Sequence, residues 1–439
     1  MELRGTEIAR IIDGNFHGKD AMIRHICVNS KLCNRDSLFF ALKGKRTDGH
    51  LYIEDAKIHG SLGAVVEKKV KELKKFFIIE VKDTLSSLKK LGAFVRDRVD
   101  NVIGITGSAG KTTTKEMIFS ILSSTIKTLK TVGNYNTEIG IPISIFEYSN
   151  EKIFVSEISA QTSEEIEEIL KMVRPDIGVV TNIGYSHTEF HKDLEGVFKA
   201  KSKLVLSLPE NGALFLNADD PNVLKMKDIR KIKVVTYGIK NGSIKASDIE
   251  MNIDGTKFRC EGEEFKLRTF GYPFIYSSLA AISVGLEFGI SIERIKESLG
   301  NFSPLWGRME VEKKNGVIFI KDYYNSNPSS VRELISSIDR VRGGRRVIYV
   351  LGDMLELGEK EEVLHREIGK FITLKEDDLV LTFGNLSRYI SEEVEKKGLT
   401  SKHFNSKDNL RKFLLGIIKE GDIVAIKGSR GMRMEEILC

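Results

Sequence analysis

The chain has 439 residues, of which 41% are hydrophobic and 30% are charged. This length exceeds a single hydrophobic core, so we expect roughly two to four domains of a soluble globular protein. The 68 basic and 62 acidic residues leave a net charge of +6. Because the basic residues are interspersed with acidic and apolar ones, a nucleic-acid-binding patch is disfavoured.

The sequence carries no sign of membrane insertion or export. The longest apolar runs, such as VIYVL at 347–351, have the length of strands and not of membrane spans. The N-terminus, MELRGTEIARII, contains no uninterrupted apolar segment, so we predict no secretory signal. We expect a cytoplasmic protein whose four cysteines, which form no CxxC pair, are reduced structural thiols: Cys27, Cys33, Cys260 and Cys439.

The order of apolar segments predicts an α/β fold. Residues 1–97 contain short apolar runs divided by the turn-like sequence GKRTDGH. From residue 101 the pattern becomes strand, loop and helix, with NVIGIT followed by a helix predicted over Lys111–Ser124. Further β-branched runs that end in polar residues are 153–159, 177–184, 213–220 and 233–238. This alternation is typical of a parallel sheet covered on both faces.

A second α/β series follows Trp306, with strand-like runs that begin near residues 317, 346, 378 and 422. Two series and a distinct N-terminal segment favour three domains, which we place at 1–97, 98–306 and 307–439. Ligands of open parallel sheets bind at the carboxyl ends of the strands, and the unusual polar clusters of this chain lie there.

The sequence TGSAGKTTTKE at 106–116 predicts a phosphate-binding loop. Gly107 and Gly110 let backbone N–H groups approach a phosphate, at the N-terminus of a helix. Lys111 would lie against the terminal phosphates, and the Thr112 hydroxyl could bind Mg²⁺. The usual loop carries a glycine six positions before the lysine, where this chain has Ile105.

Polar residues after neighbouring strands are candidates for the rest of the site. Glu157 and His187 could bind Mg²⁺. The sequence LNADDPN has two readings: its polar side chains bind the nucleotide, or they cap a turn. These side chains are Asn217, Asp219 and Asp220.

These motifs together resemble the ATP-dependent Mur ligase superfamily, whose loop reads TGxxGKT with the short glycine spacing. The matching segments, in order, are TGSAGKTTTKE, SEIS, TNIGYSHTE, KAKSK and LNADDP. The N-terminal segment 29–67 resembles the UDP-sugar-binding domain of two members. GNYNTEIGIP, KDYYNSNPSSV, LGDMLELGEKEEVLH and KGSRGMRMEE resemble the branch that adds D-alanyl-D-alanine. The DYAHTP-type stretch of the branch that adds diaminopimelate or lysine is absent from the sequence.

The resemblance implies an activity in peptidoglycan precursor synthesis. ATP would phosphorylate the carboxylate of UDP-N-acetylmuramoyl-tripeptide, and the amine of D-alanyl-D-alanine would attack the acyl phosphate through a tetrahedral intermediate. It implies ATP and Mg²⁺, with two ions expected. It also implies an N-terminal UDP-substrate-binding α/β domain, a central ATP-binding domain with a P-loop ATPase-type parallel sheet, and a C-terminal Rossmann-like α/β domain that binds the incoming dipeptide. We expect a monomer that binds neither nucleic acid nor membrane and that closes its domains during catalysis.

The resemblance also assigns residues. It implies ATP contacts from Gly107, Ser108, Ala109, Gly110, Lys111, Thr112, Thr113, Asn217 and Asp322. Metal binding is implied for Thr112, Glu157, His187 and Lys201, the last as a carbamate, although an exposed helix lysine is the alternative. Arg308 and Lys111 would act on the phosphates. Substrate contacts are implied for Ser30, Thr47, Asp48, Gly49, Asn134, Asn136, Asn325, Asn327, Lys427 and Arg430.

The chain departs from the family at three places. Phe274 and Ser277 stand where two asparagines usually hold adenine, so that part of the site is not carried over. Near the uridine site the chain has NSK at 29–31, and Lys321 and Tyr323 are altered in the C-terminal signature.

Other readings remain open at this stage. The alternatives are a related ligase that adds another amino acid, or one like folylpolyglutamate synthase. A nucleotide switch or transport ATPase, and a non-catalytic scaffold, leave the N- and C-terminal resemblance unexplained.

Overall fold

The computed structural model describes residues 1–44, 47–70, 73–160, 162–185 and 188–438. The chain forms two compact units. The first comprises Met1–Thr106, Thr125–Val179 and Lys203–Ala213, and the second comprises Gly107–Ser124, Val180–Ser202 and Leu214–Cys439.

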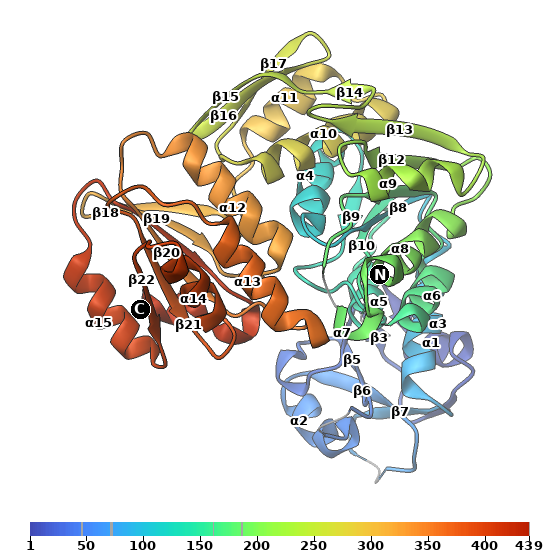
Figure 1. Ribbon diagram of the computed structural model, residues 1–439. Coiled ribbons are helices and arrows are strands. Elements are labelled where there is room, and N and C mark those ends of the chain that lie inside the picture. The colour runs from blue at the N-terminus through green and yellow to red at the C-terminus, as the bar shows by residue number, and fades with distance from the viewer. Residues whose placement is uncertain (45–46, 71–72, 161, 186–187, 439) are drawn as a thin grey trace. The chain divides into compact units, whose positions relative to one another are not determined.

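The N-terminal part of the first unit is built on a five-stranded sheet of order β2-β7-β6-β5-β4 (Figure 1). Strands β4 to β7 pair in parallel, and β2 is an antiparallel edge. Alternate strand residues such as Phe39, Ala64 and Ile78 form a core with Ile53 and Ala56 of α2. The elements are β1 (Leu3–Arg4), α1 (Gly5–Ile11), β2 (Asn15–His17), β3 (Met22–Ile23), β4 (His25–Cys27), η1 (Ser30–Leu32), β5 (Ser37–Phe40), η2 (Gly49–Tyr52), α2 (Ile53–Ile58), β6 (Ser61–Val66), β7 (Phe77–Glu80) and α3 (Thr84–Arg96).

A seven-stranded sheet of order β14-β13-β12-β11-β8-β10-β9 contains the central strands. In the first unit, β10 pairs in parallel with β8 and β9. Strands β8 and β10 are almost wholly buried, which explains their continuous apolar sequences. The elements are β8 (Asn101–Thr106), β9 (Thr128–Lys130), α5 (Gly140–Phe146), β10 (Ile153–Glu157), α6 (Ser163–Val173) and β11 (Ile177–Val180).

The second unit begins with α4 (Lys111–Ser123), which packs against α10 (Tyr272–Glu287) and α11 (Ile292–Gly300). A three-stranded antiparallel sheet, β15-β16-β17, precedes α10. The other elements are α7 (Thr188–His191), α8 (Leu194–Ser207), β12 (Ala213–Asn217), α9 (Pro221–Leu224), η3 (Lys225–Asp228), β13 (Lys233–Gly238), β14 (Ile244–Lys245), β15 (Ser247–Asn252), β16 (Gly255–Cys260) and β17 (Glu263–Leu267).

The C-terminal sheet of the second unit has the order β18-β19-β23-β20-β21-β22. All of its pairs are parallel except that of the edge strand β18. Helices α12 and α15 lie on opposite faces of it (Figure 1). The elements are β18 (Glu310–Lys314), β19 (Val317–Asp322), α12 (Pro328–Val341), β20 (Val347–Gly352), η4 (Gly358–Lys360), α13 (Glu361–Phe371), β21 (Leu379–Phe383), α14 (Arg388–Lys396), β22 (Ser401–Phe404), α15 (Lys407–Ile417), β23 (Ile423–Lys427), η5 (Arg430–Met432) and η6 (Met434–Ile437).

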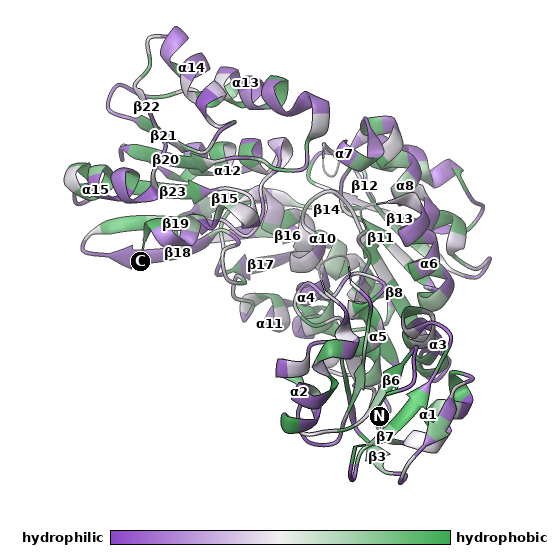
Figure 2. Ribbon diagram, turned by 90° about the horizontal axis from the view of Figure 1, so that it is seen from below, coloured by the Kyte–Doolittle hydropathy of each residue, from purple (hydrophilic) through white to green (hydrophobic). Residues whose placement is uncertain are grey.

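The hydropathy of the ribbons follows burial. Figure 2 shows β7 as largely hydrophobic, whereas α13 alternates hydrophilic and hydrophobic residues. In α13 the buried residues Leu364, His365, Ile368 and Gly369 recur at helical spacing. The helix therefore buries one stripe and leaves the opposite one in water.

The predicted α/β class is confirmed, and so is the helix predicted over Lys111–Ser124, which ends one residue earlier. The predicted strands of the first series lie in one sheet, and those of the second lie in another. The division at 1–97, 98–306 and 307–439 stays a prediction. Within the described residues, no helix is long and apolar enough to cross a membrane.

Candidate active site

The loop between β8 and α4 has the backbone geometry that its glycines predict. Gly107 has φ +153° and Gly110, which precedes the first residue of α4, has φ +77°. A Cβ atom on Gly107 would lie 1.9 Å from the Thr181 hydroxyl oxygen. Only glycine therefore fits at position 107, for both conformational and steric reasons.

The segment that follows β11 holds this loop in place. Asn182 accepts hydrogen bonds from the backbone N–H groups of Ser108 (3.0 Å) and Ala109 (2.8 Å). The Thr181 hydroxyl donates to the Ala109 carbonyl at 2.6 Å. Ser108 donates its hydroxyl to the Gly184 carbonyl at 2.9 Å. The loop is therefore ordered by its neighbours, and it leads into the N-terminus of α4, the kind of position at which backbone N–H groups bind an anion.

Two predicted phosphate-binding side chains lie at the start of α4. The Lys111 ammonium donates to the Gly107 carbonyl at 2.8 Å, so the lysine folds back over the loop. The Thr112 hydroxyl accepts a hydrogen bond of 2.9 Å from the Arg308 guanidinium. Arg308 also lies over the Tyr324 ring, 4.0 Å from its centroid. Thr113 follows on the same first turn and is partly buried.

Lys201 is buried on α8, which rules out the alternative of an exposed helix lysine. Burial lowers the pKa of its ammonium to about 7, and the charge of Lys111 contributes to the shift. By contrast, Lys199 is solvent-exposed and pairs with Glu195. An amine with this pKa is partly neutral near pH 7, which is the form that reacts with carbon dioxide.

The predicted metal ligand Glu157 belongs to the first unit. It is buried at the end of β10 and accepts a hydrogen bond of 2.9 Å from the Asn136 amide. Asn134, two residues earlier, is exposed. His187 lies outside the described residues. Among the residues that are described, no three His, Cys, Asp or Glu side chains converge as a metal site, so the four-residue site remains a prediction.

The residues after β12 cap turns. Asp219 accepts backbone hydrogen bonds from Ile239, Lys240 and Asn241. Asp220 accepts from Asn222 and Val223 at the start of α9 and from Ile183. Asn217 donates to the Thr181 carbonyl and accepts from the Asp219 N–H. The turn-capping role of LNADDPN is therefore observed, and nucleotide binding by these side chains stays a prediction.

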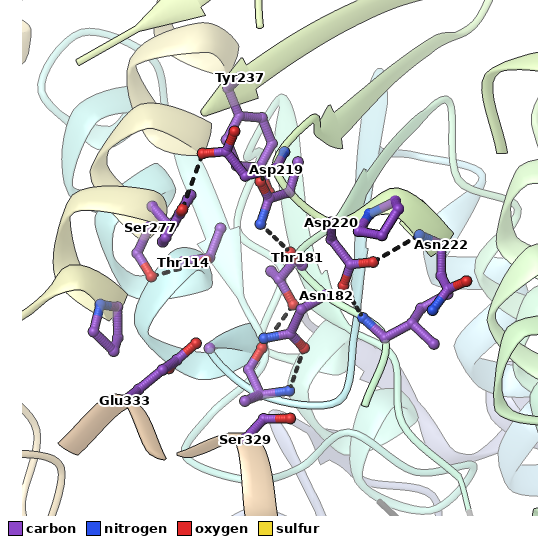
Figure 3. A pocket seen from close by; sticks show the side chains of 17 residues that line it. Thr114, Thr181, Asn182, Asp219, Asp220, Asn222, Tyr237, Ser277, Ser329 and Glu333 are labelled. Atoms are coloured by element: carbon purple, nitrogen blue, oxygen red, sulfur yellow. Dashed lines mark hydrogen bonds between the residues drawn. The ribbon is translucent and has the colours of Figure 1, made fainter. Parts of the chain in front are cut away.

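These residues nevertheless surround a cavity of about 350 Å³ next to the loop (Figure 3). This volume lies in the usual range for small-molecule sites. The cavity is lined by loop residues Ala109 and Gly110, by residues after β11 and β12, and by α10 and α12. Several lining residues were not identified as site residues from the sequence, among them Pro273, Tyr276, Ser329 and Glu333.

Neither residue at the family's asparagine positions, Phe274 or Ser277, carries a side-chain amide. Phe274 is buried and packs against Phe302. Ser277 lines the cavity and accepts a hydrogen bond of 3.1 Å from the Thr114 hydroxyl. The expectation that this chain holds a nucleobase in another way is therefore consistent with the cavity.

The C-terminal signature residues form a polar cluster at the end of β19. The Lys427 ammonium donates to the Asp322 carboxylate (2.6 Å) and to the Asn325 carbonyl (3.0 Å). Asn327 caps α12 and donates to the Ser108 carbonyl at 3.4 Å, which links this cluster to the phosphate loop. Arg430 pairs with Glu435 and is half exposed. Contacts of these residues with nucleotide or substrate stay predictions.

The predicted N-terminal substrate residues lie in the first unit. Asp48 accepts from the His50 backbone (3.0 Å), from the His50 ring (2.6 Å) and from Lys68 (3.2 Å). These hydrogen bonds, led by that of the His50 backbone, lower the pKa of Asp48. The Thr47 and Tyr52 hydroxyls are 3.0 Å apart, and the Gly49 N–H donates to the Leu42 carbonyl.

The prediction of four reduced cysteines was wrong for one pair. Cys27 and Cys33 form a disulfide, with Cα atoms 5.7 Å apart. The end of β4 and the 3-10 turn η1 bring them together, although the sequence has no CxxC motif. The bridge encloses the predicted substrate residue Ser30. Cys260 is free and buried, and Cys439 lies outside the described residues.

The sheet order, the glycine loop and the adjacent cavity define a nucleotide-binding α/β protein of the phosphate-loop class. Comparison with known proteins makes this more specific. The model of the Mur ligase middle domain matches residues 105–285, and that of the Mur ligase, glutamate ligase domain matches residues 307–430. The chain belongs to the Mur ligase family.

Relatives of similar length carry one name, UDP-N-acetylmuramoyl-tripeptide--D-alanyl-D-alanine ligase. That of Bacillus subtilis (strain 168) is 32% identical over 98% of this chain and 96% of its own. That of Escherichia coli (strain K12) is 31% identical over 99% of this chain and 97% of its own.

Solved structures extend the similarity to the fold. A crystal structure of MurF from Acinetobacter baumannii has a TM-score of 0.91 at 27% identity and covers 100% of this chain and 98% of its own. MurF ligase from Thermotoga maritima in complex with ADP has a TM-score of 0.83 at 29% identity, over 94% and 96%.

Proposed function

We propose that the protein is an ATP-dependent amide ligase that joins D-alanyl-D-alanine to UDP-N-acetylmuramoyl-tripeptide during peptidoglycan precursor synthesis. The observation that carries the proposal is the ordered loop Gly107–Gly110 beside a nucleotide-sized cavity, in a chain whose full-length relatives carry that name. We further propose a cytoplasmic, monomeric enzyme with three domains that close over the substrates.

The chemical task is to make a carboxylate electrophilic. The γ-phosphoryl group of ATP passes to the terminal carboxylate of the tripeptide, ADP leaves, and the acyl phosphate forms. The free amine of the dipeptide then attacks the acyl carbon, and the tetrahedral intermediate expels inorganic phosphate as the amide forms. Alignment and charge stabilisation therefore account for most of the catalysis.

The residues of the second unit suit this task. The first turn of α4 offers backbone N–H groups to the phosphates, and Lys111 adds a positive charge at the loop. Arg308 reaches Thr112 at the same place and is a second cation for the transferred group. We assign Lys427 and the α12 cap Asn327 to the substrates, and Asp322, which accepts from Lys427, to the nucleotide.

Magnesium fits the donors that the chain offers. Thr112 and Glu157 carry hard oxygen atoms, and a carbamate on Lys201 would add another, while His187 is proposed for a second ion. When bound, Mg²⁺ neutralises phosphate charge during the transfer. Carbamylation of Lys201 requires its neutral amine to attack carbon dioxide and lose a proton, and the lowered pKa favours this.

An acceptor-panel assay tests the proposal. The protein is incubated with ATP, Mg²⁺ and UDP-N-acetylmuramoyl-tripeptide, together with D-alanyl-D-alanine, D-alanine or lysine, and the products are identified by mass spectrometry. The dipeptide adduct and one phosphate per adduct are expected only with D-alanyl-D-alanine. An adduct with another amine identifies a different ligase, and ATP hydrolysis that needs no amine indicates a switch or transport ATPase.

Matched lysine variants test the assigned residues. Lys111→Ala is expected to abolish coupling, whereas the exposed Lys199→Ala is expected to leave it unchanged. For Lys201, ¹³C-labelled bicarbonate should give a carbamate carbonyl resonance that disappears in Lys201→Ala and persists in Lys199→Ala. Full coupling by Lys111→Ala would overturn the role of the loop.

A further inference from the structure

The cavity beside the loop has an aromatic side and an acidic side. Tyr276 and Pro273 lie one turn apart at the start of α10 and form a wall of the cavity. Glu333 lines it from α12 (Figure 3). If the proposed function holds, this cavity receives the nucleoside of ATP, and the amide side chains that the family uses there are replaced.

Tyr276 is held in one orientation. Its hydroxyl donates to Asp219 at 2.9 Å, and Asp219 is itself fixed by the backbone N–H groups of 239–241. The side chain is only partly buried, whereas Tyr237, the other lining tyrosine, is buried and donates its hydroxyl to the Val180 carbonyl. The Tyr276 ring is therefore a preordered aromatic surface, and stacking on it costs little side-chain entropy.

Glu333 is placed at the level of the sugar. Ser329, one helical turn earlier on α12, lies beside the loop: a Cβ atom on Gly184 would meet its hydroxyl oxygen at 2.6 Å and Ser108 at 3.9 Å. Residues four apart lie on the same face of a helix, so Glu333 lies one turn further from the phosphate-binding groups. In a nucleotide, the ribose is the part that follows the phosphates.

The Glu333 carboxylate is an available acceptor. Of the acidic residues lining the cavity, Asp219 and Asp220 are engaged with backbone N–H groups. Glu333 has neither a hydrogen bond nor an ion pair with any residue that the structure describes, although Lys427 and Asp322 act on it electrostatically. Ribose hydroxyls are donors that a carboxylate binds well.

We propose that Tyr276 and Glu333 form the nucleoside part of the ATP site, with the base stacked on the Tyr276 ring and the ribose hydroxyls donating to the Glu333 carboxylate. The pair replaces recognition by amide side chains with stacking and a carboxyl acceptor. Base selectivity should therefore be weak, because a ring face is sequence-tolerant, and sugar selectivity should be strong.

Calorimetric titration with ADP and 2′,3′-dideoxy-ADP tests Glu333. The wild type should bind ADP about tenfold more tightly than 2′,3′-dideoxy-ADP, which is the usual effect of hydrogen bonds to a charged group. Glu333→Ala, and the volume-preserving Glu333→Gln, should weaken ADP binding and lose most of this discrimination, with binding of dideoxy-ADP unchanged. Exposed Glu376→Ala is the control and should behave as the wild type. Undiminished discrimination by both Glu333 variants would overturn the assignment.

Tyr276 is tested with ligands that have and lack a base. Tyr276→Ala should weaken ADP binding about tenfold, as expected for loss of one stacked base, and should bind inorganic tripolyphosphate as the wild type does. Tyr276→Phe, which keeps the ring, should bind ADP almost normally. An equal loss of affinity for ADP and tripolyphosphate, or no loss of affinity for ADP, would overturn the stacking role. Wild-type protein that binds no ADP would instead overturn the proposed function itself, and thermal unfolding verifies that each variant is folded.

Discussion

Arg308 donates a hydrogen bond of 2.9 Å to the hydroxyl of Thr112, 196 positions away in the sequence. Thr112 is also the residue whose hydroxyl we assign to Mg²⁺. The Thr112 hydroxyl oxygen cannot favourably accept from the Arg308 guanidinium and bind Mg²⁺ on the same side, because the two positive charges repel each other. Binding of MgATP should therefore release Arg308 from Thr112 toward the phosphates.

Replacing Arg308 should affect the chemical step more than nucleotide binding. Arg308→Ala is expected to lower kcat about 10²-fold, the typical effect of removing a group that stabilises developing charge. The ADP dissociation constant should change by less than about threefold, since Lys111 and the helix N-terminus remain to bind the phosphates. Phosphate release under saturating substrates measures the first quantity, and calorimetry measures the second.

Arg332 offers a matched control, because it lies on the surface and pairs with Glu367. Arg332→Ala should retain wild-type kcat. A variant Arg308→Ala with normal kcat and a raised KM for ATP would show that Arg308 only assists binding.

A methyl group at position 107 should disable the loop. The Cβ atom of Gly107→Ala would overlap the Thr181 hydroxyl, whose hydrogen bond holds Ala109. We expect ADP affinity to fall at least about tenfold. Gly289→Ala is the control, since Gly289 also has a positive φ (+68°) but nothing within 4 Å of an added Cβ. It should lose about 1 kcal/mol of stability and bind ADP normally. Normal ADP binding by Gly107→Ala contradicts the importance of this close approach.

Glu333 should make stability depend on pH in a defined direction. Burial raises the pKa of Glu333 from 4.5 to about 7 in the folded protein. Between these values the folded state holds a proton that the unfolded state has lost, so stability falls as pH rises and the penalty is complete above pH 7. Glu333→Gln removes the titration. Its melting temperature relative to the wild type should therefore increase from pH 5 to pH 8, and a constant difference would argue against the shift.

The disulfide should stabilise the first unit. A bridge between residues six apart closes a short loop, for which chain-entropy models give about 2 kcal/mol. Cys33→Ser should lower the melting temperature to a similar extent as a reductant does in the wild type, and the reductant should then have no further effect. Cys260→Ser is a useful comparison, since that thiol is unbridged and its loss should leave the reductant effect intact.

The strands and the glycine loop were predictable because their signals are local. NVIGIT and VIYVL are continuous apolar runs, and Gly107 and Gly110 stand directly between a strand and a helix. The antiparallel sheet over 247–267 was not predicted, since β15 is largely exposed and β16 and β17 bury only alternate residues, so that their apolar positions form no continuous run. Only pairing between neighbouring strands reveals it.

The rest of the candidate site depends on contacts between distant residues. Asn182 lies within the motif TNIGYSHTE, but its role in holding the loop is not visible in the sequence, and Glu333, which lines the cavity, lies outside the motifs used for prediction. Tyr276 lies two residues after Phe274, where the chain departs from the family. Its hydrogen bond to Asp219 could not be predicted from the sequence. The Cys27–Cys33 bridge was also missed, although the two residues are only six apart, because a strand end and a 3-10 turn bring them together.

The same bridge has a consequence for proteolysis. Lys31 is exposed within the segment that the two sulfur atoms close into a ring. A trypsin cut after Lys31 would open the ring without separating the chain, so the nicked protein would migrate as one species in gels until the sample is reduced. The segment that we assign to the UDP-sugar could therefore be cleaved while its two ends stay tethered a few ångströms apart.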